Sequence, residues 1–360
     1  MRQRSRQNRL KIKIATRSAI VRLTILLALL SILCLWGWFS LFWMPGRSYS
    51  GELPPLNARE IELENSLERD VTQLAKTIGI RNFLENENLN AAADFLEKSL
   101  AQMGYEVKRQ KYEVQGKAYY NIEAEKRGTK NPDEIIVIGG HYDSVMDCPG
   151  ANDNATGAAS TLELARIFSQ KPTDRTLRFV EFTNEEPPFF WESEMGSLVY
   201  ATRSYEQNEN IVAMLSLETM GYFSDEKKSQ KYPFPLGFFY PDRGNFITFI
   251  GNLNSGDLVR QTIESFRSHT QFPSEGGAFP DWLPGVGWSD HWSFWQQGYK
   301  ALMVTDTAPF RYRYYHTAED TPDKVDFEKL ARVVTGLVET ISDLAQTAFI
   351  STPTRREVLR

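Results

Sequence analysis

The sequence predicts an α/β domain in which a mainly parallel mixed sheet is flanked by helices on both faces, preceded by an N-terminal transmembrane helix. Three observations lead to this fold class. Apolar runs typical of buried strands alternate with helical stretches, acids or histidines directly follow several of these runs, and an uncharged tract lies near the N-terminus. Strands that alternate with helices form mainly parallel sheets, which bind ligands at the carboxyl ends of their strands.

The N-terminal tract predicts a membrane anchor. Residues 1–22 carry eight Lys or Arg and no acid, and residues 23–46 carry no charge. As a helix, the uncharged tract reaches roughly 36 Å, enough to cross a hydrocarbon core of about 30 Å. Trp36, Trp38 and Trp43 near its end suit a membrane–water interface. We expect residues 1–22 to be a cytoplasmic leader and residues 23–46 an uncleaved signal anchor, with the remaining chain on the non-cytoplasmic side.

Two alternatives to the anchor fit the sequence less well. A cleaved signal peptide has a shorter apolar region and small residues at its cleavage site, whereas this tract ends in aromatic residues. A buried core helix would not be expected to follow a leader with eight cations.

The part of the chain beyond the leader is acidic. The whole chain has 41 Lys and Arg and 46 Asp and Glu, and removing the eight cations of the leader leaves 33 against 46, a net charge of −13. This charge disfavours nucleic acid as a partner. Of the two cysteines, Cys34 lies in the apolar tract, so Cys148 has no partner for a disulfide within the domain.

A linker is expected at residues 47–57, one domain at 58–350 and a tail at 351–360. Apolar residues spaced three to four apart indicate the first helix, and Gly104 ends the second. In chain order, we expect helices at residues 59–78, 90–103, 156–169, 196–204, 256–268, 292–297 and 324–347, and strands at 105–114, 118–125, 134–139, 177–183, 213–218, 246–251 and 301–305. Residues 223–245 and 271–287 are expected to be long functional loops.

Acids and histidines follow the predicted strands. His141 ends one strand after two glycines, with Asp143 two residues later; Glu185 and Glu186 follow the next strand, and Glu218 ends a third. A lone histidine is more often structural, and adjacent acids more often lie on a solvated face. Acids at the ends of buried strands, however, are costly without a cation. Carboxylate and imidazole groups bind zinc, and a nearby carboxylate such as that of Asp143 orients a bound imidazole.

Further candidates lie in predicted loops. Asp153 is surrounded by Gly and Ala, which allow the close approach that a shared carboxylate needs, although an N-cap of the following helix is the simpler alternative. His316 precedes the last helix, where a turn is the alternative. Asp290 and His291 are expected to lie behind the ligands or to contact substrate, with plain packing an equal alternative for His291.

Together these side chains predict a pair of metal ions. The five candidate ligands are His141, Asp153, Glu186, Glu218 and His316. If Asp153 bridges, each ion has three protein ligands and keeps open positions for water, which is the arrangement of a catalytic site. Paired ions about 3.5–4 Å apart activate a water molecule and stabilise the oxyanion of a tetrahedral intermediate.

These residues, in this order, resemble the M28 family of zinc peptidases. The resemblance covers about residues 141–321 by motif and residues 59–347 by the order of elements. It implies a zinc-exopeptidase-like fold and two Zn²⁺ per chain. By resemblance, His141 and Glu218 hold one ion, Glu186 and His316 hold the other, and Asp153 bridges them.

The resemblance implies further roles. Glu185 would be the general base, and Asp143 the acid behind His141. The Asp153–Asn154 bond matches a position where the family often has a cis peptide. The chain departs from the family in one ligand, since Glu218 stands where the family often has Asp, although Glu is also known there.

The implied activity is the release of N-terminal residues from peptides by a metal-activated water, with Tyr312, Tyr314 or Tyr315 as a donor to the oxyanion. A glutaminyl cyclase with one zinc on the same fold and a catalytically inactive, receptor-like binding module are the alternatives. Aromatic loop residues are expected to line a pocket for the first side chain: Phe189, Phe190, Trp191, Tyr222, Phe223, Trp282 and Trp288. The sequence leaves open the preferred residue, amino- against carboxypeptidase activity, cleavage of the N-terminal segment and the oligomeric state.

Overall fold

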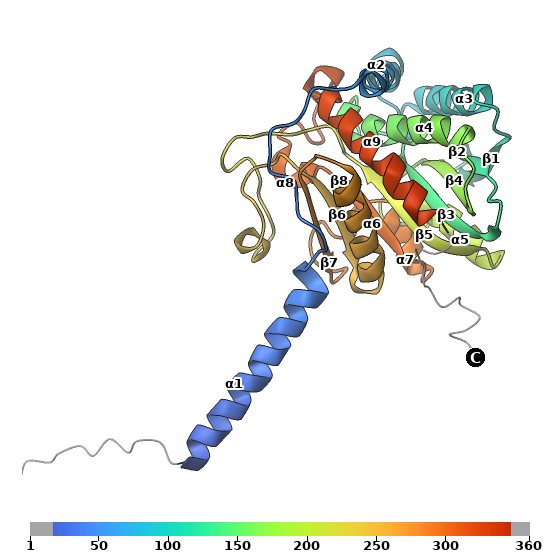
Figure 1. Cartoon of the computed structure of the whole chain (residues 1–360). Coiled ribbons are helices and arrows are strands. Elements are labelled where there is room, and N and C mark those ends of the chain that lie inside the picture. Colours follow the sequence, from blue (N-terminus) through green and yellow to red (C-terminus); the bar gives the residue numbers. More distant parts are fainter. Residues whose placement is uncertain (1–16, 347–360) are drawn as a thin grey trace, which may run out of the picture.

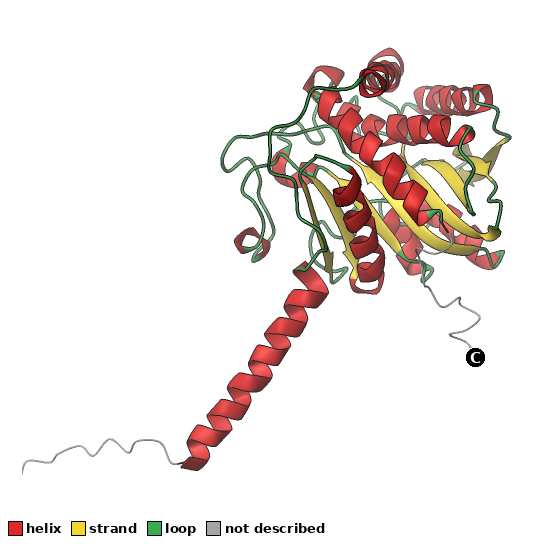
Figure 2. Cartoon of the chain, viewed as in Figure 1, coloured by secondary structure: helices red, strands yellow, loops and turns green. Residues whose placement is uncertain are grey.

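The computed structural model of the chain describes residues 17–346 and has one mixed sheet of eight strands at its centre (Figures 1 and 2). The strands are β1 (Val107–Val114), β2 (Lys117–Lys126), β3 (Asn131–His141), β4 (Arg175–Phe182), β5 (Asn210–Glu218), β6 (Ile247–Asn252), β7 (Ser274–Phe279) and β8 (Ala301–Thr305). Their order across the sheet is β1-β2-β4-β3-β5-β8-β6-β7. The predicted fold class is confirmed.

The four central strands run parallel, and this direction positions the site. β4, β3, β5 and β8 pair in parallel, so their carboxyl ends meet at one edge of the sheet. β1 and β2 continue the sheet as antiparallel strands on one side. On the other side β6 pairs with β8 in the antiparallel direction and with β7 in the parallel direction.

Helices cover both faces of the sheet. The main helices of the domain are α2 (Ala58–Thr72), α3 (Asn86–Gln102), α4 (Thr156–Ser169), α5 (Gly196–Glu206), α6 (Gly256–His269), α7 (His291–Gln296) and α9 (Phe327–Leu344). Side chains alternate across the sheet: Ile136 and Ile138 of β3 belong to the larger core cluster, while Ile135 and Val137 belong to a second cluster beside α5 and α7. Burial on both faces explains why the central strands are apolar runs in the sequence.

The predicted and observed elements differ chiefly at β7. This strand falls within residues 271–287, which were expected to be a loop, because its sequence contains Gly276, Gly277 and a glutamate and lacks a strand pattern. It is a strand because it pairs with β6 over six residues. The short helix α8 (Ala308–Arg311) was not expected either. Residues 1–16 of the predicted leader and residues 347–360, which include the predicted tail, lie outside the described residues.

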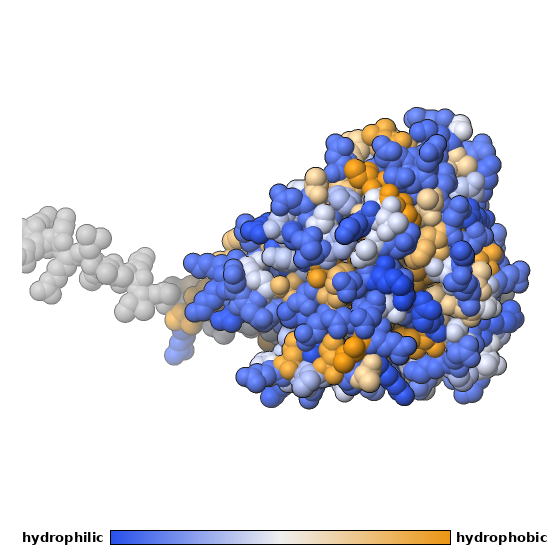
Figure 3. All heavy atoms as spheres, turned by 90° about the horizontal axis from the view of Figure 1, so that it is seen from above, coloured by the Kyte–Doolittle hydropathy of each residue, from blue (hydrophilic) through white to orange (hydrophobic). Residues whose placement is uncertain are grey.

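The N-terminal helix α1 (Arg17–Gly37) continues into a π-helical turn, η1 (Trp38–Phe42), and projects away from the domain (Figure 1). Within the described residues, Arg17–Phe42 is the one helix long and apolar enough to cross a membrane. A membrane anchor and a signal sequence near the N-terminus both meet this criterion of length and composition. The face of the domain that lies opposite α1 is mainly hydrophilic, with apolar residues in small separate groups (Figure 3).

Candidate metal centre

The predicted ligands come from different elements but converge at the carboxyl edge of the central strands. His141 is the last residue of β3 and Glu218 is the last residue of β5. Glu186 follows β4, whereas Asp153 lies in the π-helical turn η3 (Ala151–Ala155) that leads into α4. His316 is brought to the same edge by the loop that follows α8.

Two groups of three donors share one carboxylate. In the first group, Nε2 of His141 lies 3.4 Å from Oδ1 of Asp153 and 3.3 Å from Oε2 of Glu218. In the second, Nε2 of His316 lies 3.0 Å from Oδ2 of Asp153 and 3.4 Å from Oε2 of Glu186. The donor atoms within each group all lie within 4.8 Å of one another. The two oxygens of Asp153 therefore face different groups.

Two properties of these groups fit zinc: the distances between their donor atoms, and carboxylate oxygens that have no hydrogen-bond partner in the described part of the chain. Donors about 2.0–2.2 Å from a tetrahedral zinc ion lie about 3.3–3.6 Å from one another, which is close to the donor separations seen here. Among the described residues 17–346, no hydrogen-bond partner is found for Oδ2 of Asp153, although His316 is near, or for Oε1 of Glu186. Both atoms are buried, and a buried acceptor without a partner is costly unless a cation binds it.

Asp143 connects His141 of the first group with the acidic pair that follows β4. Its Oδ1 lies 3.5 Å from Nδ1 of His141. Its two oxygens also accept the backbone N–H groups of Glu185 and Glu186, each at 3.1 Å. The backbone carbonyl of Asp143 also lies 3.2 Å from Nδ1 of His141, so this one residue orients both the imidazole at the end of β3 and the acidic pair that follows β4. Oε2 of Glu185 lies 3.8 Å from Nε2 of His141, beside the first donor group.

Asp320 was not among the residues expected from the sequence. Its carboxylate accepts the backbone N–H groups of Asn152, at 2.8 Å, and Asp153, at 3.0 Å, and the hydroxyl of Tyr312, at 2.7 Å. These bonds fix the backbone that carries the shared carboxylate. The available signal was an acid only four residues after His316, in a stretch that reads as a turn.

Asn154 and Ser289 hold Glu218 in place. The Asn154 amide donates to the carbonyl of Leu217 at 2.8 Å and to Oε2 of Glu218 at 3.4 Å. The hydroxyl of Ser289 donates to the same Glu218 oxygen at 2.8 Å. The Asp153–Asn154 peptide bond is cis, at the position where the family resemblance implies one.

The two histidines are strongly biased toward their charged forms by the surrounding acids. Burial alone would lower the pKa of His141, but nearby carboxylates, that of Glu218 foremost, raise this pKa well above its usual value. Burial likewise opposes the charge of His316, yet Asp153 and Glu186 raise the pKa of His316 to about 10. Each imidazole therefore lies in a strongly negative environment.

The acids outnumber the cations at this edge of the sheet. Burial, with the charge of Asp153, raises the pKa of Glu186 to about 7. Burial also raises the pKa of Glu185 well above its usual value, and the neighbouring Glu218 adds to the shift. Carboxylates that resist ionisation when two histidines are their nearest cations are suited to bind divalent ions, which supply the missing positive charge.

Asp290 and His291 lie side by side at the start of α7 but in different surroundings. Burial raises the pKa of Asp290 to about 7, and the nearby charge of His141 opposes this shift. His291 instead donates from Nε2 to the carbonyl of Val286 at 2.7 Å and packs edge-on against the ring of Trp295. Burial lowers the pKa of His291 to about 4, so its ring is neutral.

The three candidate tyrosines differ in their contacts. The hydroxyl of Tyr312 is used by Asp320, and that of Tyr314 contacts Arg313. The ring of Tyr315 stacks on His316, with a centroid distance of 3.8 Å. Burial and then the acids of the site, beginning with Asp153, raise the pKa of Tyr315 well above its usual value. Among the three, Tyr315 is therefore the tyrosine whose pKa is raised by the candidate metal ligands.

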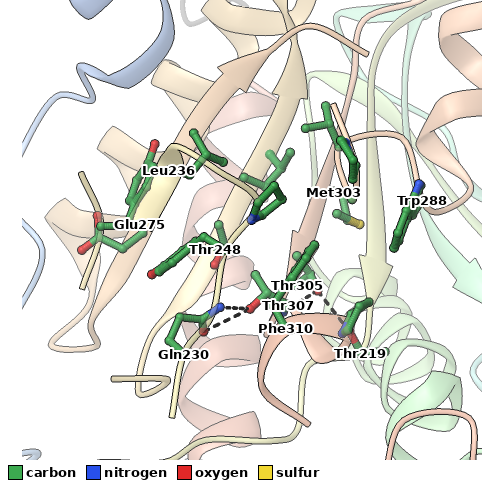
Figure 4. A pocket seen from close by; sticks show the side chains of 18 of the residues that line it. Thr219, Gln230, Leu236, Thr248, Glu275, Trp288, Met303, Thr305, Thr307 and Phe310 are labelled. Carbon is green, nitrogen blue, oxygen red and sulfur yellow. Dashed lines mark hydrogen bonds between the residues drawn. The ribbon is translucent and has the colours of Figure 1, made fainter. Parts of the chain in front are cut away.

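A mainly apolar pocket of about 760 Å³, its open mouth included, adjoins the metal centre (Figure 4). Glu218, Thr219 and Tyr315 line it at the metal end. Leu236 and Glu275 lie at the opposite end, and Met303 of β8 lies between the two ends (Figure 4). The pocket lies on the face of β6, β7 and β8 that loops cover, since side chains of all three strands line it.

Most of the aromatic residues that were expected to line this pocket lie elsewhere. Of the seven, Trp288 is among the lining residues. Phe189 packs instead against Phe83, and Phe223 against Phe272. The observed aromatic lining comes mainly from other positions: Tyr232, Tyr240, Phe246, Phe279, Phe310 and Tyr315. Which aromatic residues meet depends on β7 and on the fold of the long loops, and neither is visible as a local sequence pattern.

Comparisons with known proteins agree with this geometry. Residues 121–341 match the sequence model of Peptidase family M28. An uncharacterized protein of Escherichia coli K12, YfbL, is 36% identical over 281 residues, which cover 76% of this chain and 85% of YfbL. The aminopeptidase YwaD of Bacillus subtilis is 45% identical over 208 residues, 57% of this chain but 39% of YwaD.

Two solved structures share the fold. The zinc aminopeptidase BSAP from Bacillus subtilis superposes with a TM-score of 0.65 and 15% identity, over 84% of this chain and 98% of that one. A glutaminyl cyclase from Fimbriiglobus ruber superposes with a TM-score of 0.57 and 20% identity, over 82% of this chain and 97% of that one. At these identities the matches establish the architecture alone.

Proposed function

Because this chain belongs to peptidase family M28, we propose that it is a zinc-dependent aminopeptidase whose peptidase domain spans residues 58–350. The relatives that carry the names aminopeptidase and zinc metalloprotease support peptide hydrolysis. The observation that carries the proposal is the pair of donor groups that share Asp153. His141 and Glu218 would hold one zinc ion, Glu186 and His316 the other, and Asp153 would bridge them.

Each nearby group has a role in this reaction. Two zinc ions would lower the pKa of a bound water and polarise the scissile carbonyl. Glu185, beside the first donor group, accepts the proton of the attacking water on its carboxylate and returns it to the leaving amine. Asp143 orients Glu185 through its backbone N–H. The hydroxyl of Tyr315 donates to the developing oxyanion.

The pocket supports a preference for peptides that begin with a large apolar residue. The first side chain would enter between Met303 and Phe310, away from the acids of the metal centre. The free amine of the peptide would remain at the metal end, where the surplus of carboxylates near Glu218 favours a cation. A pocket that is apolar over most of its length favours leucine-like or phenylalanine-like first residues over charged ones.

We further propose that residues 23–46 anchor the enzyme in a membrane. The eight cations of residues 1–22 favour a cytoplasmic position for the leader. The linker at residues 47–57 then begins the non-cytoplasmic part of the chain, which continues to the tail at 351–360. Peptides on that side of the membrane are the substrates that such an enzyme meets.

A glutaminyl cyclase is the second candidate, because two cyclase structures share this fold over more than four fifths of the chain. The two activities differ in metal content and in product. Two zinc ions per chain and release of a free amino acid support the aminopeptidase. One zinc ion and loss of ammonia from an N-terminal glutamine would support the cyclase instead.

A panel of aminoacyl chromogenic substrates tests the proposal. The full-length chain in detergent is expected to hydrolyse leucyl and phenylalanyl substrates, to lose activity in a strong chelator and to regain it with zinc. Activity that persists after complete removal of metal would contradict the mechanism. A zinc-loaded chain that hydrolyses no member of the panel would instead favour a receptor-like binding module.

A further inference from the structure

The most exposed aromatic side chains of the domain gather next to the end of the N-terminal helix. Outside α1, the three most exposed large hydrophobic residues of the described chain are Phe234 (85%), Phe238 (78%) and Trp282 (77%). They belong to two loops, residues 232–240 and 280–288. Exposure of large aromatic rings to water is unfavourable in free energy. A cluster of exposed rings therefore indicates a surface that binds an apolar partner or a membrane.

The first loop packs directly against η1, which continues the apolar helix, and the second packs on the same core cluster as η1. The ring of Phe239 lies 4.5 Å from that of Phe42 and 6.2 Å from that of Trp38. Phe279, at the end of β7 just before the second loop, lies 5.5 Å from Phe42. Leu41 and Leu283 pack on the same small core cluster. The loops are thus held beside the C-terminal end of the apolar segment.

Polar contacts fix this end of the segment to the domain. The guanidinium of Arg267 on α6 donates to the carbonyl of Pro45 at 2.9 Å. That of Arg260 on the same helix donates to the carbonyl of Ser40 at 3.4 Å. In Figure 1, β7 and the loop that precedes β6 reach the level at which α1 leaves the domain. The position of the loops relative to a membrane is therefore set by α1 itself.

We propose that the tips of these two loops insert into the lipid–water interface of the membrane that α1 crosses. This inference rests on the proposed anchor. The occupant is the bilayer, because Phe239, which follows the exposed Phe238, contacts Trp38 of the aromatic band at the end of the apolar segment. Aromatic side chains are enriched at this depth in membrane proteins. The opposite face of the domain is mainly hydrophilic and faces water (Figure 3).

The same loops form a wall of the substrate pocket. Tyr232, Leu236 and Tyr240 of the first loop line the pocket, whereas Phe234 and Phe238, which alternate with them, are exposed on the outside. The second loop contributes Pro284, two residues after Trp282. Insertion of the tips therefore holds the apolar end of the pocket at the membrane surface, where peptides with apolar N-termini collect.

Labels that report lipid contact test the proposal in the full-length chain. In a Cys34→Ala background, with the remaining Cys148 buried, single Leu30→Cys, Phe238→Cys and Glu206→Cys variants are labelled with the fluorophore NBD. Phe238 and Glu206 are both exposed, but Glu206 is the last residue of α5 and belongs to neither loop. The labelled chains are placed in phosphatidylcholine vesicles with and without a doxyl group on the lipid.

The expected pattern separates the two proposals. The label at position 238 is expected to shift its emission to the blue and to lose intensity with doxyl groups near the headgroup, while that at position 206 does neither. The label at position 30 is expected to be quenched by doxyl groups deep in the acyl chain. If position 30 is not quenched, the anchor itself is wrong, and the inference fails with it.

Two other outcomes overturn the inference alone. A label at position 238 that resembles the one at position 206, with position 30 quenched, would show that the loop stays in water. A label at position 238 that shifts to the blue without lipid quenching would show that a protein surface, such as a second copy of the chain, covers the loop. The readout is independent of hydrolysis, so loss of the peptidase proposal would leave this result unchanged.

Discussion

The two ends of the substrate pocket are built in opposite ways. At the metal end, buried acids lie at the carboxyl edge of parallel strands. Hydrogen bonds with backbone N–H groups fix their positions, as between Asp320 and the backbone of Asp153. At the other end, Tyr232 and Tyr240 pack with Leu236, and Phe239 of the same loop lies against Phe42 of η1. Charge and hydrogen-bond geometry therefore set the side-chain positions at the metal end, and apolar packing sets them at the aromatic end.

This difference shows which side chains of the molecule must be positioned precisely. A displaced carboxylate at the metal end changes the chemistry, because ligand and base positions must hold to a fraction of an ångström. A displaced ring at the aromatic end changes only how well an apolar side chain is accommodated, because hydrophobic contact is not directional. We expect substitutions at the metal end to cost far more activity than substitutions at the aromatic end.

The largest effect is expected at Glu185, the proposed general base. Glu185→Gln keeps the shape of the side chain but removes the proton acceptor, and we expect kcat for a leucyl chromogenic substrate to fall about 10²–10⁴-fold. Zinc content should be unchanged. Glu192→Gln, an exposed acid on the loop that follows, is the matched control and should retain full activity. Undiminished turnover by Glu185→Gln would remove this residue from the mechanism.

A smaller loss is expected at Asp320, which holds the backbone of Asp153, the proposed bridging ligand. Asp320→Asn weakens acceptance of the N–H groups of Asn152 and Asp153, and we expect zinc affinity to fall about 10–100-fold. Competition with a chromogenic chelator measures this affinity. Asp323→Asn, an exposed acid three residues later, should leave affinity unchanged. Equal affinities in the two variants would mean that Asp320 serves packing alone.

At the aromatic end, a change of specificity is expected in place of a loss of chemistry. Met303→Phe fills the pocket between its two ends, and we expect kcat/KM for phenylalanyl relative to alanyl substrates to fall about tenfold. The matched control is Met146→Phe, because Met146 is exposed and outside the pocket. An unchanged ratio in Met303→Phe would show that the first side chain binds elsewhere.

The smallest effect concerns stability without metal. The raised pKa values of Glu186, about 7, and His316, about 10, mean that the folded metal-free chain binds more protons than the unfolded chain. The stability that these groups contribute is present at low pH, and it is lost as pH rises through about 7 and then about 10. We expect the Tm of the chelated protein to fall as pH rises from about 5 to 9.

Zinc changes this pH dependence, because divalent ions replace the bound protons. The Tm of the zinc-loaded chain is therefore expected to fall less over the same range. A chelated His316→Gln variant should lack part of the fall at the alkaline end. Identical slopes with and without zinc would indicate that the ions do not bind among these groups.

Sequence patterns were most informative where a candidate ligand is the last residue of a strand. His141 and Glu218 each end an apolar run, so the strand and its candidate ligand were recognised together. Asp153 lies in the turn η3 and His316 in a loop, so neither ends a strand. They were predicted from the Gly and Ala around Asp153 and from the resemblance of the residue order to a known family. All five side chains come together in the structure, from five separate segments.

The missed features depend on tertiary context. Nothing local marks Asp320 as the acceptor for the backbone at Asp153, since the two are joined only after the loop beyond α8 folds back. β7 is a strand through its pairing with β6, despite its two glycines. With β7 unrecognised, the sequence could not reveal that Phe279 and Phe42 meet, or which aromatic residues line the pocket.

The most direct test of the account is the position of zinc in crystals of the zinc-loaded chain, measured by anomalous scattering at the zinc edge. We predict two peaks about 3.5–4 Å apart, one beside His141 and Glu218 and one beside Glu186 and His316, with Asp153 between them. A single peak at this edge of the sheet, or zinc bound away from Asp153, would contradict the proposed two-metal centre.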